Sequence, residues 1–268
     1  MKNWPFQIGF LIVGIIIAVA FWQFYRPGQQ ASLQVVAAPP ISKPQAESAI
    51  QHPVITEPEG LKATESVMAE EQSLPELRQS DTLMSEVMAK LFADQKLDRF
   101  FVFEHFIERF VVMVDNLPRP QLPATHRPLK KTSGKFLTNG ERDRLTIDSA
   151  NYRRYTPLVK MLAALDTQQV VAVYKRLYPL FQEAYQGLGY PNAYFNDRLI
   201  EVIDHLLTTP PISGPVYLVQ PKALLLYADP ALEELSAGRK ILLRCGPENA
   251  AQIKAMLHKY RRGLTAGN

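Results

Sequence analysis

Apolar residues at the start of the chain form one long run that the rest of the sequence does not repeat. Residues 4–25 are apolar apart from Gln7 and Gln23, and residues 8–22 contain no polar side chain. About 20 apolar residues are enough for a helix to span the hydrocarbon core of a bilayer. We therefore predict a transmembrane anchor over residues 1–26.

A cleaved signal peptide is the alternative interpretation of this run. Ala18-Val19-Ala20 has the small-x-small form of a cleavage site. Apolarity continues beyond it, however, into the aromatic cluster Phe21, Trp22, Phe24 and Tyr25, which is typical of a membrane interface and favours a retained anchor. After Arg26 no Lys or Arg occurs until Lys43, so the charge bias points the N-terminus to the cytoplasm and the bulk of the chain outward.

Residues 27–73 and 74–264 differ in composition. The first stretch is rich in Pro, Ala, Gln and Glu without a fixed apolar period, so we predict a disordered spacer. The second is long enough for one domain with a real core. From residue 73 onward there are 26 basic and 20 acidic side chains, against 4 and 6 before it. The single cysteine, Cys245, forms no internal disulfide and does not indicate a compartment.

Periodic apolar positions make this domain mainly α, a single helical domain with a short β-hairpin. The predicted helices are 80–92, with Ser80 as N-cap, 97–114, 149–165, 168–188, 194–207, 231–244 and 247–262. Pro157 and Pro179 should break or kink the third and fourth of them. Residues 135–147 are predicted to form the hairpin, with Asn139-Gly140 as its turn, and 216–220 a short strand. Gly246 and Pro247 fit the junction between the last two helices.

Familiar catalytic and metal-binding signatures are missing from the sequence. It has no cysteine pair, no H-E-x-x-H, no phosphate-binding loop, no G-x-S-x-G and no Ser-x-x-Lys. The five histidines are scattered without ligand spacing. We therefore predict no cofactor, no metal site and no catalytic residue; the sequence favours a binding module, while an unfamiliar enzyme stays open.

Two polar helix faces are candidates for chemistry. Glu104, His105, Glu108 and Arg109 share one stripe of a very apolar segment, where His105 could pair with Glu108 as an acid and base, or simply form the wet face of a central helix. Asp197, Glu201, Asp204 and His205 share a face that could bind a metal or be an ordinary amphipathic surface. At the start of that helix, Asn196 or Asp197 could cap amides, and Arg198 could form a bidentate pair.

Tyrosines and basic residues supply two further candidates. Tyr174, Tyr178, Phe181 and Tyr185 follow helical spacing, so they could stack on sugar rings or be core. Residues 119–144, the basic window, contain seven Lys or Arg and two acidic residues, and could meet an anionic surface or an acidic partner, or be a solvated loop. The candidate contact residues are Arg109, Arg119, Lys130, Lys131, Lys135, Tyr185, Asn196, Asp197 and Arg198.

Several segments are familiar as a set. They are Leu74-Pro75 with Ser80-Asp81, RFVVMVDNLPR (109–119), YPLFQEAY (178–185), FNDRLIEVIDHLL (195–207), VQPK (219–222) and LSAGRK (235–240). Together they resemble a bacterial family catalogued as Domain of Unknown Function 3014, over about residues 74–264. The resemblance implies an envelope protein with an N-terminal anchor, and it implies no activity, ligand or catalytic residue.

These observations favour one function and leave a second open. The first is a non-enzymatic envelope module: a single-pass inner-membrane protein, mostly periplasmic, whose domain binds a partner protein or an anionic surface but no nucleic acid. The alternative is a protein that binds or cleaves cell-wall glycan or peptidoglycan, using the polar stripes or the Tyr-rich helix. A deep pocket lined by His105, Glu108 or Asp197 would favour the second.

Overall fold

A computed structural model describes residues 50–54, 74–93, 96–123, 125–130, 134–141, 144–221 and 224–266. Over these residues, no helix is both apolar enough and long enough to cross a bilayer. The predicted anchor and most of the predicted spacer lie outside the described residues, so the structure does not test them.

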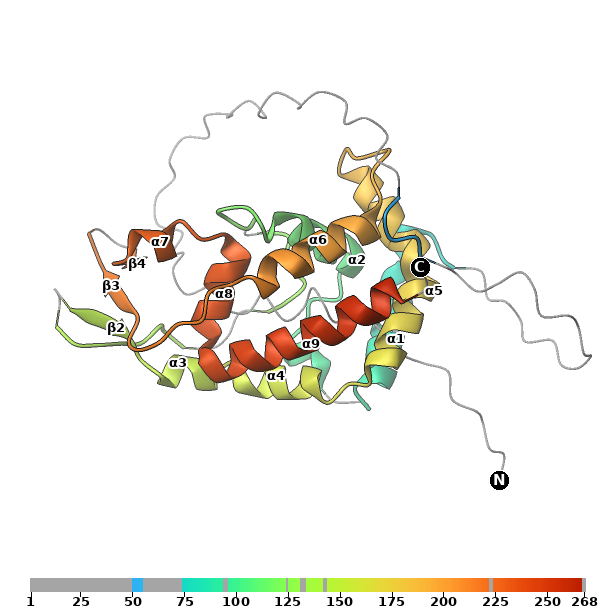
Figure 1. Ribbon diagram of the computed structural model, residues 1–268. Helices are drawn as coiled ribbons and strands as arrows, with labels where there is room; N and C mark the ends of the chain where they lie inside the picture. Colours follow the sequence, from blue (N-terminus) through green and yellow to red (C-terminus); the bar gives the residue numbers. More distant parts are fainter. Residues whose placement is uncertain are drawn as a thin grey trace, which may run out of the picture.

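The described residues form a mainly helical domain with a small antiparallel sheet at one end (Figure 1). The helices are α1 (Ser80–Leu91), α2 (Phe106–Asn116), α3 (Ala150–Arg153), α4 (Thr156–Ala163), α5 (Thr167–Gly187), α6 (Phe195–Leu207), α7 (Pro230–Glu233), α8 (Ala237–Cys245) and α9 (Pro247–Thr265). Two 3-10 turns are η3 (Leu77–Gln79) and η4 (Leu97–Arg99). The strands are β1 (Thr138–Asn139), β2 (Leu145–Ile147), β3 (Tyr217–Val219) and β4 (Leu226–Tyr227).

Helix α2 is the centre of the helical body, by which we mean α1, α2, α4, α5, α6, α8 and α9. It packs against α1, α5 and α6, while α9 packs against α4, α5, α6 and α8. An aromatic cluster joins three of these helices: the Phe110 and Phe181 rings are 5.5 Å apart, and Phe181 stacks on Phe195 at 6.0 Å. Most apolar side chains of α2 are buried in these contacts, while Glu108 and Arg109 are only partly buried and form the polar stripe that the sequence indicated.

The sheet end consists of β1 to β4 in that order, every neighbouring pair antiparallel. The predicted hairpin and the predicted strand near residue 218 are confirmed, whereas β4 was not predicted. The hairpin turn differs from the prediction, because Asn139 pairs with Thr146 inside the sheet instead of lying in the turn. Gly140 has φ 95°, and a Cβ there would lie 2.3 Å from the carbonyl oxygen of Arg144, so only glycine fits.

The second predicted helix, 97–114, is wrong in its first half. Its residues form η4 and then a bridge between Phe101 and Leu129, and α2 begins only at Phe106. The Asp81 carboxylate accepts hydrogen bonds from the amides of His105 (2.8 Å) and Phe106 (3.2 Å). A remote carboxylate thus caps α2, an arrangement that local periodicity does not reveal.

Other boundaries also depend on single side chains. Ser80 is not an N-cap: its hydroxyl donates to the Leu77 carbonyl oxygen at 2.7 Å. The predicted helix 231–244 is two helices, because Ser236 caps α8 by accepting from the Arg239 amide. Pro157 lies in the first turn of α4, and the predicted helix is broken there into α3 and α4, but Pro179 lies within α5 without ending it. Gly246 (φ 83°) does separate α8 from α9.

Candidate functional site

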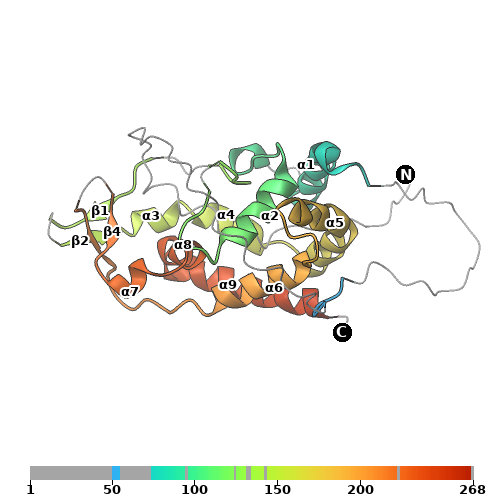
Figure 2. The ribbon, with the colours of Figure 1, turned by 90° about the horizontal axis from the view of Figure 1, so that it is seen from above.

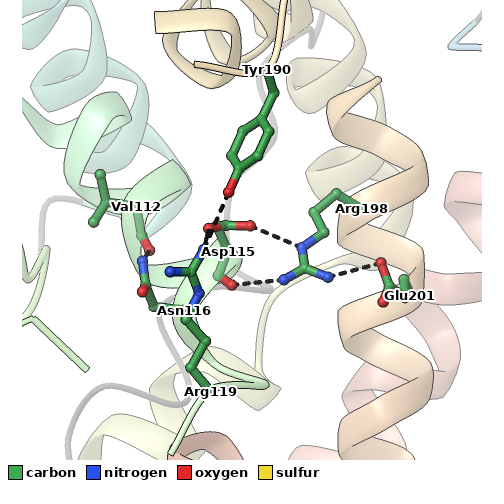
Figure 3. A network of polar contacts seen from close by, with 7 residues as sticks. All are labelled: Val112, Asp115, Asn116, Arg119, Tyr190, Arg198 and Glu201. Atoms are coloured by element: carbon green, nitrogen blue, oxygen red, sulfur yellow. Dashed lines mark hydrogen bonds and ion pairs between the residues drawn. The ribbon is translucent and has the colours of Figure 1, made fainter. Parts of the chain in front are cut away.

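An ion-pair network, which we call the Asp115 network, joins the end of α2 to α6 (Figure 3). The Asp115 side chain is 5% exposed; one oxygen accepts from Arg198 Nε at 3.0 Å and the other from an Arg119 guanidinium nitrogen at 2.7 Å. Arg198 also donates to the Asp115 backbone oxygen and to the Glu201 carboxylate, each at 2.8 Å. Arg119 reaches the hydroxyl of Tyr190, in the α5–α6 connection, at 3.2 Å. The network therefore fastens three parts of the helical body together.

Charge is balanced within the Asp115 network, since two carboxylates meet two guanidinium groups. Burial opposes the positive charge of Arg198, but the hydrogen bond to Glu201 and the charge of Asp115 outweigh it and raise the pKa of Arg198. Burial also raises the pKa of the neighbouring Tyr185 to about 12, with a contribution from Asp115. Each carboxylate of the network is paired with a guanidinium group of the same domain, so we interpret the arrangement as a structural staple. Of the sequence candidates, the network contains Arg119 and Arg198, and Tyr185 lies beside it.

A second polar site lies at the beginning of α6, where residues 50–54 lie against the domain (Figures 1 and 2). One Asp197 oxygen accepts from the Gln51 amide at 3.0 Å and the other from the His52 amide at 2.7 Å. Asn196 donates to the His52 carbonyl oxygen at 2.9 Å, and the Val54 amide donates to the Tyr194 hydroxyl at 2.7 Å. We call Tyr194, Asn196 and Asp197 the α6 cradle. Asp197 was expected to cap amides at the start of its own helix; it instead accepts from two amides of the segment 50–54.

Helix α5 holds the α6 cradle in place through the hydrogen bonds of Gln182. Gln182 accepts from the Tyr178 hydroxyl (2.7 Å) and from the Phe195 amide (2.9 Å), and it donates to the Ala193 carbonyl oxygen (2.8 Å). Burial raises the pKa of Tyr178, and its hydrogen bond to Tyr194 raises this pKa further. Gln182 therefore caps the start of α6 and fixes the loop from which Tyr194 projects.

The remaining candidates do not gather with these two sites. Arg109 is tied to its own surroundings by the backbone oxygens of Glu104 and Thr125, each at 2.7 Å. In the basic window, Lys130 and Lys135 are exposed, Arg127 is buried, and Lys131 lies outside the described residues. The window is thus divided between an interior arginine, the Asp115 network and exposed loops.

The polar stripes and the tyrosines have ordinary structural roles. His105 pairs with Glu108 at 3.5 Å, as foreseen, on the surface. The carboxylates of α6 are each taken by a different partner, Asp204 by Arg261 at 2.5 Å, and the described residues contain no cluster of potential metal ligands. Tyr174, Tyr178, Phe181 and Tyr185 are all buried, so they are core, and their rings are not available for stacking on an external sugar.

Sequence reasoning missed the outer face of the sheet. Ile147, Leu218 and Tyr227 face inward and form a small core with Val216 and with Leu243 of α8. Tyr217 and Val219 point the other way and are 45% and 40% exposed. The signal was present in the sequence: Val216 to Val219 is apolar at every position, so a sheet covered on one side must leave some of these side chains uncovered.

Comparison with known proteins gave one match. Neither curated proteins nor solved structures matched the chain significantly. A protein-family model, however, matches residues 106–261, from the first residue of α2 into α9. This range includes the Asp115 network, the α6 cradle and the whole sheet. The resemblance seen in the sequence is therefore confirmed, and the chain belongs to the family described as Protein of unknown function (DUF3014).

Proposed function

We propose that this protein is a single-pass inner-membrane protein of the bacterial envelope whose helical domain binds an acidic partner protein through the outer face of the sheet. The observation that carries this proposal is the exposed apolar surface at the sheet end. Six large apolar side chains in the described residues are well exposed, and Leu137, Tyr217, Val219 and Leu224 are four of them. Each belongs to the strands or to segments next to them.

Such a surface has the composition of a protein contact. Apolar side chains exposed together, with polar residues around them, mark interaction sites more often than scattered ones do. Tyrosine is enriched among residues that dominate binding energy, and a basic rim attracts an acidic partner. Lys135 and Arg144 are both exposed, the first just before β1 and the second directly before β2.

The location in the envelope rests on the amino-acid sequence. The apolar run over residues 4–25 supports the anchor, and the lack of Lys or Arg between Arg26 and Lys43 supports a periplasmic domain. Fusion of alkaline phosphatase after Asn268 tests this topology. An active fusion in the membrane fraction is expected, whereas an inactive fusion or a soluble product beginning at Phe21 would contradict it.

Site-specific photo-crosslinking in membranes tests the proposed contact. A photoreactive residue replaces Val219 on the sheet in the full-length chain, and a matched variant carries it at Ala251, which is exposed on α9. We expect an adduct with a protein from Val219 only. Additional Lys135→Glu and Arg144→Glu changes should weaken it. Equal adducts from both positions, no adduct, or an adduct with lipid alone would each overturn the proposal.

A glycan-binding or enzymatic role lacks comparable support. The rings proposed to stack on sugar are buried, and the α6 carboxylates are engaged within the protein. These contacts favour the protein-binding proposal.

A further inference from the structure

We propose that the α6 cradle is a latch for the chain's own tether, and that it makes the tether leave the domain at the end opposite the sheet. The occupant is the segment 50–54, which lies 20 residues before the first residue of the domain proper, Leu74. The latch would give the molecule a polarity, with the tether at one end and the exposed apolar sheet face at the other.

The cradle recognises the main chain of its occupant. Asp197 uses both carboxylate oxygens on two successive amides, those of Gln51 and His52, at 3.0 and 2.7 Å. Hydrogen bonds from amides to a carboxylate are stronger than those between neutral groups. Pro53 has no N–H, and it falls between the amides of His52 and Val54 that the cradle binds. The spacing of donors in this segment therefore matches the acceptors on the domain.

Burial shows that this is a built site rather than a passing surface contact. Asn196 is completely buried, and its side-chain nitrogen donates to the His52 carbonyl oxygen. The other polar atom of its side chain, Oδ1, is buried without a hydrogen-bond partner, as is Nδ1 of His52. Val54 packs its side chain against the main core. The domain thus buries polar groups that segment 50–54 alone helps to satisfy.

Helix α6 does not use the Asp197 carboxylate to cap its own amides. Its first amide, that of Phe195, is already capped by Gln182 at 2.9 Å. The Asp197 carboxylate lies in the first turn, where the helix dipole favours a negative charge, and its oxygens are directed to the amides of another segment. The position is thus suited to hold a peptide amide pair.

The two ends of the domain are clearly separated in the structure. In both views, segment 50–54 (blue) lies beside the end of α9, near the C-terminus, while β1 to β4 lie at the far end of the molecule (Figures 1 and 2). A chain that enters at the latch therefore keeps the outer sheet face away from its own point of entry.

The latch would also limit the distance between the domain and the membrane, and this consequence rests on the proposed membrane anchor. If the anchor ends at residue 26, the first fixed point of the chain is residue 50 rather than residue 74. The connecting segment shortens from residues 27–73 to residues 27–49, and its fully extended limit falls from roughly 160 Å to roughly 80 Å. The latch would thus hold the domain closer to the membrane with its sheet end directed outward.

Hydrogen–deuterium exchange on the full-length protein in detergent micelles tests the latch. In the wild type, peptides covering residues 50–54 should exchange slowly. Asp197→Ala should accelerate exchange at Gln51 and His52 by about tenfold or more, since it removes two charge-assisted bonds. Tyr194→Phe removes the acceptor for Val54 alone and should accelerate exchange there. Asp204→Ala is the matched control, because it removes a carboxylate from the same helix that pairs with Arg261 instead.

Each outcome of this experiment is decisive. Slow exchange in α2 and α5 reports that a variant is folded. If Asp197→Ala is unfolded by this measure, Tyr194→Phe is the more conservative second variant. Fast exchange of residues 50–54 in the wild type, or equal acceleration by Asp204→Ala, would overturn the latch. Protection that rises with protein concentration would overturn occupancy within one chain in favour of exchange between two copies. Because no partner is needed, a failed crosslink at Val219 would leave this test unaffected.

Discussion

The helical body and the sheet end of this domain use their side chains in opposite ways. In the body, the apolar side chains of α2 other than Val112 are buried, and Asp115, with 5% of its side chain exposed, meets two guanidinium groups. At the sheet end, the small core has five buried residues in the part of the chain that the structure describes, and Tyr217 and Val219 remain open to solvent. The comparison assigns stability to the first region, and it is to the second that we attribute the proposed binding.

The difference follows from how each element is covered. Helix α2 is apolar around most of its circumference and is stable only when other helices surround it. Strand β3 is also apolar on both faces, but α8 contributes Leu243 only to the inner one. An apolar strand face without a second layer persists only if something else covers it or if its area is small.

The largest expected effect is from a cavity in the helical body. Phe181→Ala removes a fully buried ring between Phe110 and Phe195 and should cost about 3–5 kcal/mol of unfolding free energy. Urea denaturation followed by circular dichroism measures it. Tyr217→Ala, an aromatic truncation on the exposed sheet face, should change the same free energy by less than about 0.5 kcal/mol. Similar losses from both variants would contradict the division of roles.

The next effect concerns the Asp115 network. Asp115→Ala leaves Arg198, a largely buried arginine, without its main carboxylate and should destabilise the protein by about 2–4 kcal/mol. Glu201→Ala removes the exposed partner of the same arginine and should cost less than about 1 kcal/mol. Both values come from the same urea titration. If both variants lost the same free energy of unfolding, the stabilisation by the Asp115 network would not depend on the burial of Asp115.

A smaller effect is a dependence of stability on pH. Burial, with a contribution from Arg239, lowers the pKa of His205 in the folded protein, and His205 Nε2 lies 2.8 Å from the Ser236 hydroxyl, which itself accepts from the Arg239 amide. The lowered pKa favours the neutral imidazole in the folded protein. In the unfolded chain, the His205 imidazole becomes protonated near the ordinary pKa of histidine, about 6.5. In the folded chain it becomes protonated only at lower pH.

The contribution of neutral His205 to the free energy of unfolding should therefore be fully present at pH 7 and above. It should be lost as the pH drops below about 6.5 toward the lowered pKa. Unfolding free energies of the wild type and His205→Gln, measured from pH 7.5 to pH 5, check this. The variant should lose part of the pH dependence. An unchanged slope would show that other groups cause it.

The sequence predicted what depends on periodicity and missed what depends on distant partners. Strong apolar patterns identified α5, α6 and α9 nearly to their ends, and Gly246 with Pro247 located a junction. The start of α2 was misplaced because its cap comes from Asp81, and β4 is too short for a pattern of its own. Composition alone gave no sign that residues 50–54, inside a stretch without apolar period, would bind Asp197. Arg198 was expected to form a bidentate pair; it instead donates one hydrogen bond to the Asp115 carboxylate and one to the Asp115 backbone oxygen, and Asp115 lies 83 residues away.

The smallest expected effect on stability is from charge at the sheet end, and it is the most informative about binding. Replacing Lys130, Lys135 and Arg144 together by Glu should change the unfolding free energy by less than about 0.5 kcal/mol per site, because all three side chains are exposed on loops. The crosslinked partner of Val219 should nevertheless bind more weakly. This loss should shrink as salt is added, since exposed charges are screened beyond about 8–10 Å at physiological ionic strength. Lys259→Glu, on the exposed surface of α9, supplies the matched charge reversal and should leave binding unchanged. A loss that ignores salt would assign recognition to Tyr217 and Val219 alone, and equal losses from Lys259→Glu would show that net charge, not the sheet end, attracts the partner.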